Sequence, residues 1–391
     1  MDNFMGRVSP PLEEGWLRPT GAARVVRHGK RFGRHDHPGL RPPLLKRRGG
    51  LALLLFAGVL LAQARTVQPH PKERHLRNIH QLTYGGENAE AYFSADGKKI
   101  ILQSTRAPYK CDQIFTMNTD GTNVKMVSTG KGRTTCSYFT PDGSRIIYAS
   151  THLGSPDCPP DPDRSNGYVW PLFKTFDIFS AKPDGSDLKR LTNAVGYDAE
   201  GTISPDGRKI IFTSTRDNDI ELYEMNIDGT NQHRLTNEVG YDGGAFYSPD
   251  GQWIVWRASR PKTAAEVKQF KDLLAKELVM PTKLEIFIMK TDGTQKKQLT
   301  SNGAANFAPF FLPDGKRIIF ASNVNATNPG IPNFDLFLIN RDGTGLEQVT
   351  FDENFDAFPM FSPDGKRLVW ASNRNAPTEG STNVFIADWV N

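Results

Sequence analysis

Residues 198–236 read DAEGTISPDGRKIIFTSTRDNDIELYEMNIDGTNQHRLT and contain two Asp-Gly turns between runs of β-forming residues. An Asp-Gly pair in this setting is a strong hairpin signal, because the turn needs positive φ angles and the flanking strands must pair. The first turn lies in Ser-Pro-Asp-Gly at residues 204–207, and the second in Asp-Gly-Thr at residues 228–230. We therefore expect four strands that are joined by two hairpins and one connection.

The same unit repeats along the chain. The Asp of the first turn follows Ser-Pro or a close variant six times, at Asp96, Asp142, Asp206, Asp250, Asp314 and Asp364. Asp206 and Asp250 are 44 residues apart, which fits the roughly 40–45 residues of a four-stranded propeller blade. Asp142 to Asp206 and Asp250 to Asp314 both span 64 residues. These two longer repeats indicate insertions of about twenty residues, which in repeat proteins map to loops on one face.

The last repeat is completed from the other end of the chain. After Asp364, strands are expected at residues 367–372 and 383–389, with no fourth strand behind them. Residues 76–83 resemble the fourth-strand segment 230–236 and can complete that blade. Closing the ring removes exposed edge strands, which otherwise invite aggregation. The expected fold over residues 65–391 is an all-β, six-bladed β-propeller of four-stranded blades, whose last blade is closed by the N-terminal strand.

Residues 1–64 are expected to lie outside this fold. Three basic residues at 46–48 precede an apolar run at 51–61, and Ala-Gln-Ala at 62–64 has the small-x-small pattern of a signal-peptide cleavage site. The run is too short for a comfortable membrane span, and no Cys follows it, so we expect no stable membrane anchor. Residues 1–45 are interpreted as an extension that results from a start codon placed too far upstream. The mature protein is expected to be periplasmic or secreted.

The basic character of the chain belongs to this N-terminal segment. Residues 1–64 hold eleven Lys and Arg and four Asp and Glu, which is a net charge of +7. The whole chain has a net charge of +5, so residues 65–391 have a net charge of −2. A net negative domain does not offer the basic footprint that nucleic-acid binding requires. No nucleic-acid partner is expected.

The three cysteines fall in the first two blades. Export to an oxidising compartment permits a disulfide among Cys111, Cys136 and Cys158, and the odd count leaves one thiol over. A zinc site is the alternative, but the chain has no C-x-x-C spacing to support it. We expect one disulfide, and the sequence leaves its pairing open.

Two columns of mostly polar residues flank each first turn. They lie six residues before and twelve residues after the Ser position, and a two-residue hairpin brings them nearly opposite each other. They are interpreted either as caps of the strand entries or as a polar ring around one mouth of the central channel. Repetition favours the structural interpretation, because a catalytic group is usually singular. The first column is Asn88, Thr134, Asp198, Asp242, Asn306 and Asp356, and the second is Arg106, His152, Arg216, Arg260, Val324 and Arg374.

A third column, four residues before the Ser position, departs from the repetition. It holds Glu90, Cys136, Glu200, Gly244, Ala308 and Phe358. Glu90 and Glu200 stand where other blades are small or apolar, and with His152 they are the candidate for a metal or acid–base site. The alternative is that His152 is a substituted structural position in an arginine-rich column. A divalent metal is the only cofactor that these residues indicate.

Both insertions are expected on the face where the first strands begin. The first, residues 152–174, is rich in Pro and Asp and contains Tyr168 and Trp170. Pro-rich loops are stiff and aromatic residues are common contact anchors, so these two aromatics join the Asp and Arg columns in the predicted binding face. The second, residues 261–283, has Val267, Phe270, Leu274 and Leu278 at helical spacing, which predicts an amphipathic helix.

The order of these motifs resembles the TolB-type β-propeller repeat family. The shared pattern is D-x-x-x-x-x-S-P-D-G, an apolar run with S-x-R, then I-Y/F-x-M, D-G-T and a final L-T, and residues 198–236 carry it almost completely. The resemblance covers residues 76–389 and implies a WD40-like propeller that binds proteins in the cell envelope. TolB has a separate α/β domain before its propeller. Here only residues 65–75 separate the cleavage site from the first strand, so that domain's contacts are not implied.

Two catalytic alternatives accompany this interpretation. Propellers of prolyl-oligopeptidase-type enzymes look similar, but their hydrolase domain and its G-x-S-x-G motif are missing from this sequence. A propeller lyase or metal hydrolase would use Glu90, Glu200 and His152. The favoured hypothesis is a non-catalytic scaffold whose partner is an envelope protein or peptide.

Overall fold

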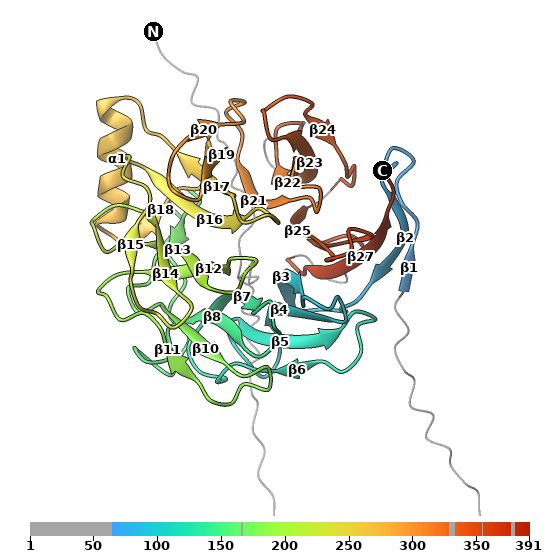
Figure 1. The fold of residues 1–391 in the computed structure, drawn as a ribbon, viewed down its shortest axis with the longest axis horizontal. Helices are drawn as coiled ribbons and strands as arrows, with labels where there is room; N and C mark the ends of the chain where they lie inside the picture. The colour runs from blue at the N-terminus through green and yellow to red at the C-terminus, as the bar shows by residue number, and fades with distance from the viewer. Residues whose placement is uncertain (1–64, 166, 328–332, 354, 377–379) are drawn as a thin grey trace, which may run out of the picture. The chain divides into compact units, whose positions relative to one another are not determined.

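The computed structural model describes residues 65–165, 167–327, 333–353, 355–376 and 380–391. The expected signal peptide and upstream extension, residues 1–64, lie outside the described residues. Within the described part, strands form six antiparallel blades around a central axis, with the first strand of each blade innermost (Figure 1). The predicted six-bladed propeller is confirmed.

The first three blades follow the chain order. They consist of β3 (Glu87–Phe93), β4 (Lys99–Thr105), β5 (Gln113–Asn118) and β6 (Lys125–Met126); β7 (Thr134–Phe139), β8 (Ile146–Ser150), β10 (Asp177–Ala181) and β11 (Lys189–Arg190); and β12 (Asp198–Ile203), β13 (Lys209–Ser214), β14 (Glu221–Asn226) and β15 (His233–Arg234).

The last three blades are built in the same way, and the sixth takes its outer strands from the N-terminal part of the domain. They consist of β16 (Tyr241–Tyr247), β17 (Trp253–Ser259), β19 (Glu285–Lys290) and β20 (Lys297–Gln298); β21 (Asn306–Phe311), β22 (Arg317–Ser322), β23 (Asp335–Asn340) and β24 (Glu347–Gln348); and β25 (Asp356–Phe361), β26 (Arg367–Ser372), β27 (Asn383–Trp389), β2 (Leu76–Gln81) and β1 (Arg65–Val67).

The N-terminal strand β2 lies beside the C-terminal strand β27 (Figure 1). Their register pairs Leu76 with Trp389 and Gln81 with Phe385. Thr83, just after β2, accepts a hydrogen bond from the backbone N–H of Val384 at 2.9 Å. The threonine of each L-T motif makes the same contact inside its own blade, as Thr236 does with Leu222 and Thr300 does with Ile286. The sequence analysis missed β1, which adds a short fifth strand outside β2.

The Ser-Pro-Asp-Gly turns are held by a local hydrogen-bond network. In the third blade, the Ser204 hydroxyl donates to the Asp206 carboxylate at 2.6 Å, and the backbone N–H of Arg208 donates to the same carboxylate oxygen at 3.1 Å. These donors lower the pKa of Asp206. Gly207 has a φ of +72°, a conformation that costs little only for glycine. The turn is therefore specified by the four residues themselves.

The hydrophobic core lies between neighbouring blades. Ile211, Phe212, Trp256, Phe320 and Trp370 belong to second strands and are fully buried. Side chains alternate between the two faces of a strand, so each second strand packs on both of its neighbours and reads as a nearly continuous apolar run. This is why the first Asp-Gly turn of each blade is followed by such a run in the sequence.

The two insertions form additional elements. The second contains α1 (Ala264–Leu274), whose N-terminus has a capping box between Thr263 and Glu266, and Phe270 is its buried residue. The predicted helix is therefore confirmed, but it does not extend to Leu278. Instead, β18 (Leu278–Val279) pairs with β9 (Trp170–Pro171) of the first insertion. No helix in the described part of the chain is long and apolar enough to cross a membrane.

Candidate functional site at the channel mouth

The third column of the sequence lines the neck of the central channel. In each blade the first strand has a β-bulge, and its third-column residue has a positive φ between 49° and 60°. A bulge bends the strand and re-aims a side chain. The six residues that line the neck in this way are Glu90, Cys136, Glu200, Gly244, Ala308 and Phe358. Departures from the repeat therefore identified channel-lining positions.

The neck is chemically asymmetric. Its polar side comes from Glu90, Cys136 and Glu200 of the first three blades, and its apolar side from Ala308 and Phe358 of the last two. A non-glycine residue in the left-handed region costs of the order of 1–2 kcal/mol. Five of the six positions carry this cost within the described bulges. The bulge is thus retained in all six blades, although only Gly244 is a residue type that adopts a positive φ without this cost.

Glu200 is the centre of a buried ion-pair network. Its carboxylate pairs with the Arg257 guanidinium of the next blade and accepts hydrogen bonds from Thr213 Oγ1 at 2.6 Å and from the Gly244 N–H at 2.9 Å. Tyr241 Oη lies 3.1 Å from both carboxylate oxygens and 2.8 Å from Arg257 Nη2. Burial raises the pKa of Tyr241 well above its usual value, so its hydroxyl remains protonated. The charge of the Glu200 carboxylate is balanced by Arg257, and its oxygens already accept hydrogen bonds. This arrangement suits a group that holds neighbouring side chains in place better than one that transfers a proton.

Two consecutive glycines make room for this network. A Cβ atom on Gly243 would lie 2.6 Å from Glu200 Oε2, and one on Gly244 would lie 2.6 Å from Arg257 Nη1. Both distances are shorter than van der Waals contact. The glycines allow the acidic and basic side chains of adjacent blades to meet over the backbone of β16.

Next to the neck, the channel opens into a pocket with mixed walls. Its polar side comes mainly from the first two blades, and its apolar side from the first insertion and the last two blades. The lining residues are Asp112, Arg133, Thr134, Thr135, Cys136, Trp170, Pro171, Leu172, Phe173, Phe176, Tyr197, Glu200, Arg257, Phe307 and Phe358. Six of them are aromatic. Two of these six are indicated by the sequence pattern: Trp170 in the first insertion and Phe358 in the third column.

The paired strands β9 and β18 form a strap that joins the two insertions. Trp170 pairs with Val279, and the backbone N–H of Leu172 donates to Glu277 at 2.7 Å. The ring of Trp170 lies over the Arg257 guanidinium, 5.0 Å from centroid to Cζ. Its indole N–H donates to the hydroxyl of Tyr168 at 3.3 Å. Trp170 therefore lines the pocket, whereas Tyr168 is buried and supports it from behind.

His152 and Glu90 have different surroundings. His152 Nδ1 lies 2.8 Å from the Ser150 hydroxyl, and its ring packs 4.5 Å from Phe179, a residue of the same blade. Burial lowers the pKa of His152, and the nearby Lys131 and Arg190 charges lower it further. Glu90 instead faces the neck, where the thiol of Cys136 lies 3.5 Å from its carboxylate. Among the described residues, no group of three His, Cys, Asp or Glu side chains is placed to hold a metal ion.

The Asp and Arg columns form pairs within single blades. Each Arg reaches back to the first-column residue of its own blade, at the start of the first strand, and lies over an aromatic ring. Burial raises the pKa of Asp198 and Asp242. The pairs are Arg106 with Asn88 at 2.7 Å, Arg216 with Asp198 at 2.9 Å, Arg260 with Asp242 at 2.6 Å and Arg374 with Asp356 at 2.6 Å.

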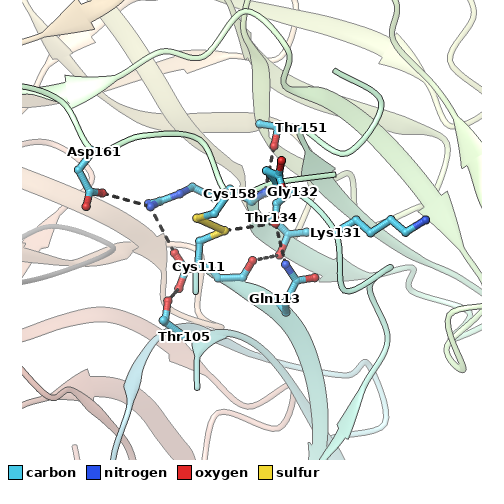
Figure 2. Close-up of a disulfide and its surroundings, with 12 residues drawn as sticks. Thr105, Cys111, Gln113, Lys131, Gly132, Thr134, Thr151, Cys158 and Asp161 are labelled. Atoms are coloured by element: carbon cyan, nitrogen blue, oxygen red, sulfur yellow. Dashed lines mark hydrogen bonds and ion pairs between the residues drawn. A yellow bond between two sulfur atoms is a disulfide. The ribbon is translucent and has the colours of Figure 1, made fainter. Parts of the chain in front are cut away.

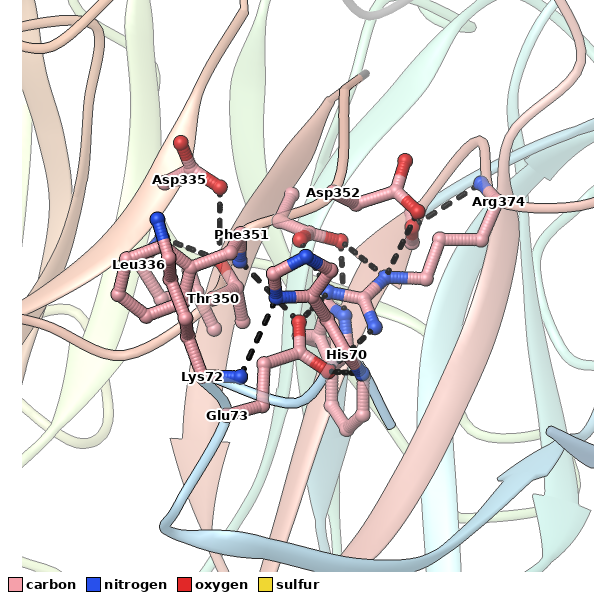
Figure 3. Close-up of polar contacts among 12 residues, drawn as sticks. His70, Lys72, Glu73, Asp335, Leu336, Thr350, Phe351, Asp352 and Arg374 are labelled. Atoms are coloured by element: carbon pink, nitrogen blue, oxygen red, sulfur yellow. Dashed lines mark hydrogen bonds and ion pairs between the residues drawn. The ribbon is translucent and has the colours of Figure 1, made fainter. Parts of the chain in front are cut away.

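In the sixth blade, the Arg374 pair gains a partner from the N-terminal segment. Figure 3 shows Glu73 below Arg374, with Asp352 on the other side. Glu73 is fully buried and accepts two hydrogen bonds from Arg374, at 2.5 and 3.1 Å. It also accepts the backbone N–H of Phe351 at 3.1 Å. Sequence reasoning missed Glu73, because it precedes the first recognisable strand.

A disulfide joins Cys111, which precedes β5, to Cys158 in the first insertion (Figure 2). Their Cα atoms are 5.9 Å apart, and Cys136 is not part of the bond. The expectation of one disulfide is met, and the structure decides its pairing. Next to it, Arg133 lies 3.9 Å from Asp112 and 3.5 Å from Asp161. The bond thus ties the first insertion to the first blade beside the pocket.

Comparison with known proteins agrees with the repeat. A model of the TolB β-propeller domain matches residues 174–273. A curated TolB homologue from Chlorobium luteolum is 24% identical over 156 residues, which is 34% of this chain and 35% of the length of that relative. The chain is a β-propeller, and its repeats are similar to those of the TolB type. The matched region includes the stretch of residues 198–236 that best shows the pattern.

Solved structures share this fold. A putative TolB from Agrobacterium tumefaciens superposes with a TM-score of 0.51 at 18% identity, over 78% of this chain and 91% of that one. A gluconolactonase from Xanthomonas campestris superposes with a TM-score of 0.52 at 12% identity, over 84% and 95%. At these identities the likeness concerns the fold alone, and one fold serves both kinds of protein.

Arg257 is the main site residue that the sequence analysis missed. It lies nine residues after the Ser position, where the other blades carry Gln103, Ala149, Thr213, Ala321 and Ala371. A single charge in an otherwise uncharged column is the same kind of departure that identified Glu90 and Glu200. The charge of Arg257 is therefore a signal that the sequence itself carries.

Proposed function

We propose that this TolB-type propeller is an exported, non-catalytic scaffold that binds an envelope protein or peptide at the channel mouth. The main evidence for this proposal is the pocket beside the strap, where six aromatic side chains lie next to a buried ion pair. Aromatic residues in a concave, rigid setting are the usual anchors of protein recognition. The resemblance to TolB-type propellers implies the same role, which is protein binding in the cell envelope.

The surroundings of the titratable groups support binding over catalysis. Glu200 is held by Arg257, and the Asp and Arg columns form pairs within their own blades. A general base needs a carboxylate that is available to a substrate proton. These groups stiffen the mouth instead.

An exported location agrees with the disulfide between Cys111 and Cys158. Such bonds persist in oxidising compartments and are rare in the bacterial cytosol. Mass spectrometry of the exported protein should find an N-terminus just after Ala64. A retained segment 1–64 would contradict the export part of the proposal.

The binding part is tested by capture from envelope extract, followed by titration with the purified partner. Trp170→Ala should lower the partner's affinity at least tenfold, because it removes an anchor of the wall. Val124→Ala is the matched control, since Val124 is an exposed apolar residue beside an Asp-Gly-Thr turn on the opposite face. Equal affinity of the wild type and the Trp170 variant would refute the proposal. Turnover of a substrate that disappears in Glu90→Gln would favour an enzyme.

A further inference from the structure

Arg133 lines the pocket and is held more loosely than the arginines of the Asp and Arg columns. It lies just before β7, and its side chain is 13% exposed. Its guanidinium lies 3.9 Å from Asp112 and 3.5 Å from Asp161. The arginines of the columns reach their partners at 2.6 to 2.9 Å, which is the usual length of a charge-assisted hydrogen bond. No such short contact fixes the guanidinium of Arg133 among the described residues.

The hydrogen-bonding capacity of Arg133 is only partly used. A guanidinium has five N–H donors, and within the described part of the chain the buried Nε–H of Arg133 has no acceptor. Asp112 lies beyond hydrogen-bond distance of the guanidinium, and its carboxylate accepts the Thr105 hydroxyl at 2.6 Å. A buried donor without an acceptor is destabilising. A loosely held guanidinium can therefore turn toward a stronger acceptor that enters the pocket.

Asp161 is a weak partner for Arg133. It lies between two prolines of the first insertion, near the disulfide (Figure 2), and its side chain is 62% exposed. An exposed ion pair contributes little, so a carboxylate from outside the chain can replace Asp161. Lys131 adds positive charge nearby, since it is close enough to lower the pKa of His152.

Most of the remaining wall of the pocket is apolar. Phe307 and Phe358 pack edge to face with centroids 5.5 Å apart, and the first insertion contributes further aromatic rings. The other arginine of the pocket, Arg257, is already paired with Glu200. The pocket therefore offers two features to a ligand, which are an incompletely bonded guanidinium and an aromatic wall.

We propose that the pocket recognises a carboxylate next to an apolar side chain in the bound polypeptide. The carboxylate replaces Asp161 on the guanidinium of Arg133, and the apolar side chain packs against the aromatic wall. The carboxylate belongs either to a C-terminus or to an Asp or Glu side chain. This inference rests on the proposed function, because both groups belong to the captured partner. It adds the chemical class of the segment that enters the pocket.

Three probes test the inference on the purified chain by ligand-observed NMR: N-acetyl-phenylalanine, N-acetyl-aspartyl-phenylalanine amide and its asparaginyl analogue. The first carries the carboxylate of a C-terminus, the second carries that of a side chain, and the third is neutral. At least one anionic probe should bind saturably and roughly ten times more tightly than the neutral probe. The tighter anionic probe identifies the source of the carboxylate. Equal binding of all three, tighter binding of the neutral probe, or no saturable binding would each overturn the inference.

Two substitutions with opposite effects locate the carboxylate. Arg133→Met should weaken the tighter anionic probe about tenfold and leave the neutral probe unchanged. Asp161→Asn should strengthen the same anionic probe about two- to fivefold, because it removes the competing carboxylate. Asp157→Asn is the matched control, since Asp157 is an exposed acidic residue of the same insertion. Equal affinity of the Asp161 and Asp157 variants would overturn the inference, even if Arg133→Met does not fold.

Capture of the partner separates this inference from the proposed function. A partner that binds through this carboxylate should be displaced by the tighter anionic probe and should bind more tightly to Asp161→Asn. A partner that depends on Trp170 but shows neither effect would refute the inference and leave the proposed function standing.

Discussion

Arg257→Met tests whether the buried network at the neck contributes to stability. The substitution keeps an apolar stem of similar length and removes the guanidinium, whose side chain is only 8% exposed. It leaves Glu200 buried without its cation and removes two contacts to the hydroxyl of Tyr241, at 2.8 and 3.2 Å. Breaking a buried ion pair in this way costs about 3–5 kcal/mol. Loss of the contact with Trp170 adds roughly 0.5–2 kcal/mol.

The assay is a double-mutant cycle by urea denaturation at neutral pH, followed by tryptophan fluorescence. Arg257→Met alone should lower the free energy of unfolding by about 3.5–7 kcal/mol. In the double variant with Glu200→Gln the uncompensated charge is gone, so the cost should be smaller than the sum of the single costs by about 1–3 kcal/mol. A single-variant loss below about 1 kcal/mol, or strict additivity in the cycle, would refute the reasoning.

Three further expectations concern other parts of the ring. Deleting residues 65–84 should expose the edge of β27 and cause aggregation or marked destabilisation, and an unchanged melting temperature would contradict closure by β2. Burial, with the charge of Asp356, raises the pKa of Asp335 to about 8, so the folded state holds a proton that the unfolded state releases, and stability should fall as pH rises from about 4 to about 8. Asp335→Asn should flatten that slope in urea titrations at several pH values. Cys158→Ser should lower the free energy of unfolding by about 2–4 kcal/mol and abolish the effect of reductant, because the disulfide closes a long loop with a sequence separation of 47.

Local chemistry explains how much of the fold was predictable. Each Ser-Pro-Asp-Gly and Asp-Gly-Thr turn is held by hydrogen bonds between residues at most five apart, such as Ser204 with Asp206 and Asp228 with Thr230. All the residues that form such a turn lie within a few positions of one another, so the turn can be recognised in the sequence without knowledge of the fold. Their sixfold recurrence then predicts the propeller. The channel-lining column was predictable for the same reason, because a departure from a repeat is visible in the sequence.

The contacts that make the site join residues from different blades or different insertions. Arg257 meets Glu200 across 57 residues, and Glu73 meets Arg374 across 301 residues. The strap pairs Trp170 with Val279, although each insertion by itself resembles an independent loop. The turns, the strands, the repeat and the chemical character of the columns therefore follow from the order of the amino acids alone. Which side chains meet at the mouth depends on closure of the ring, because closure brings together groups whose pairing leaves no local signal in the chain.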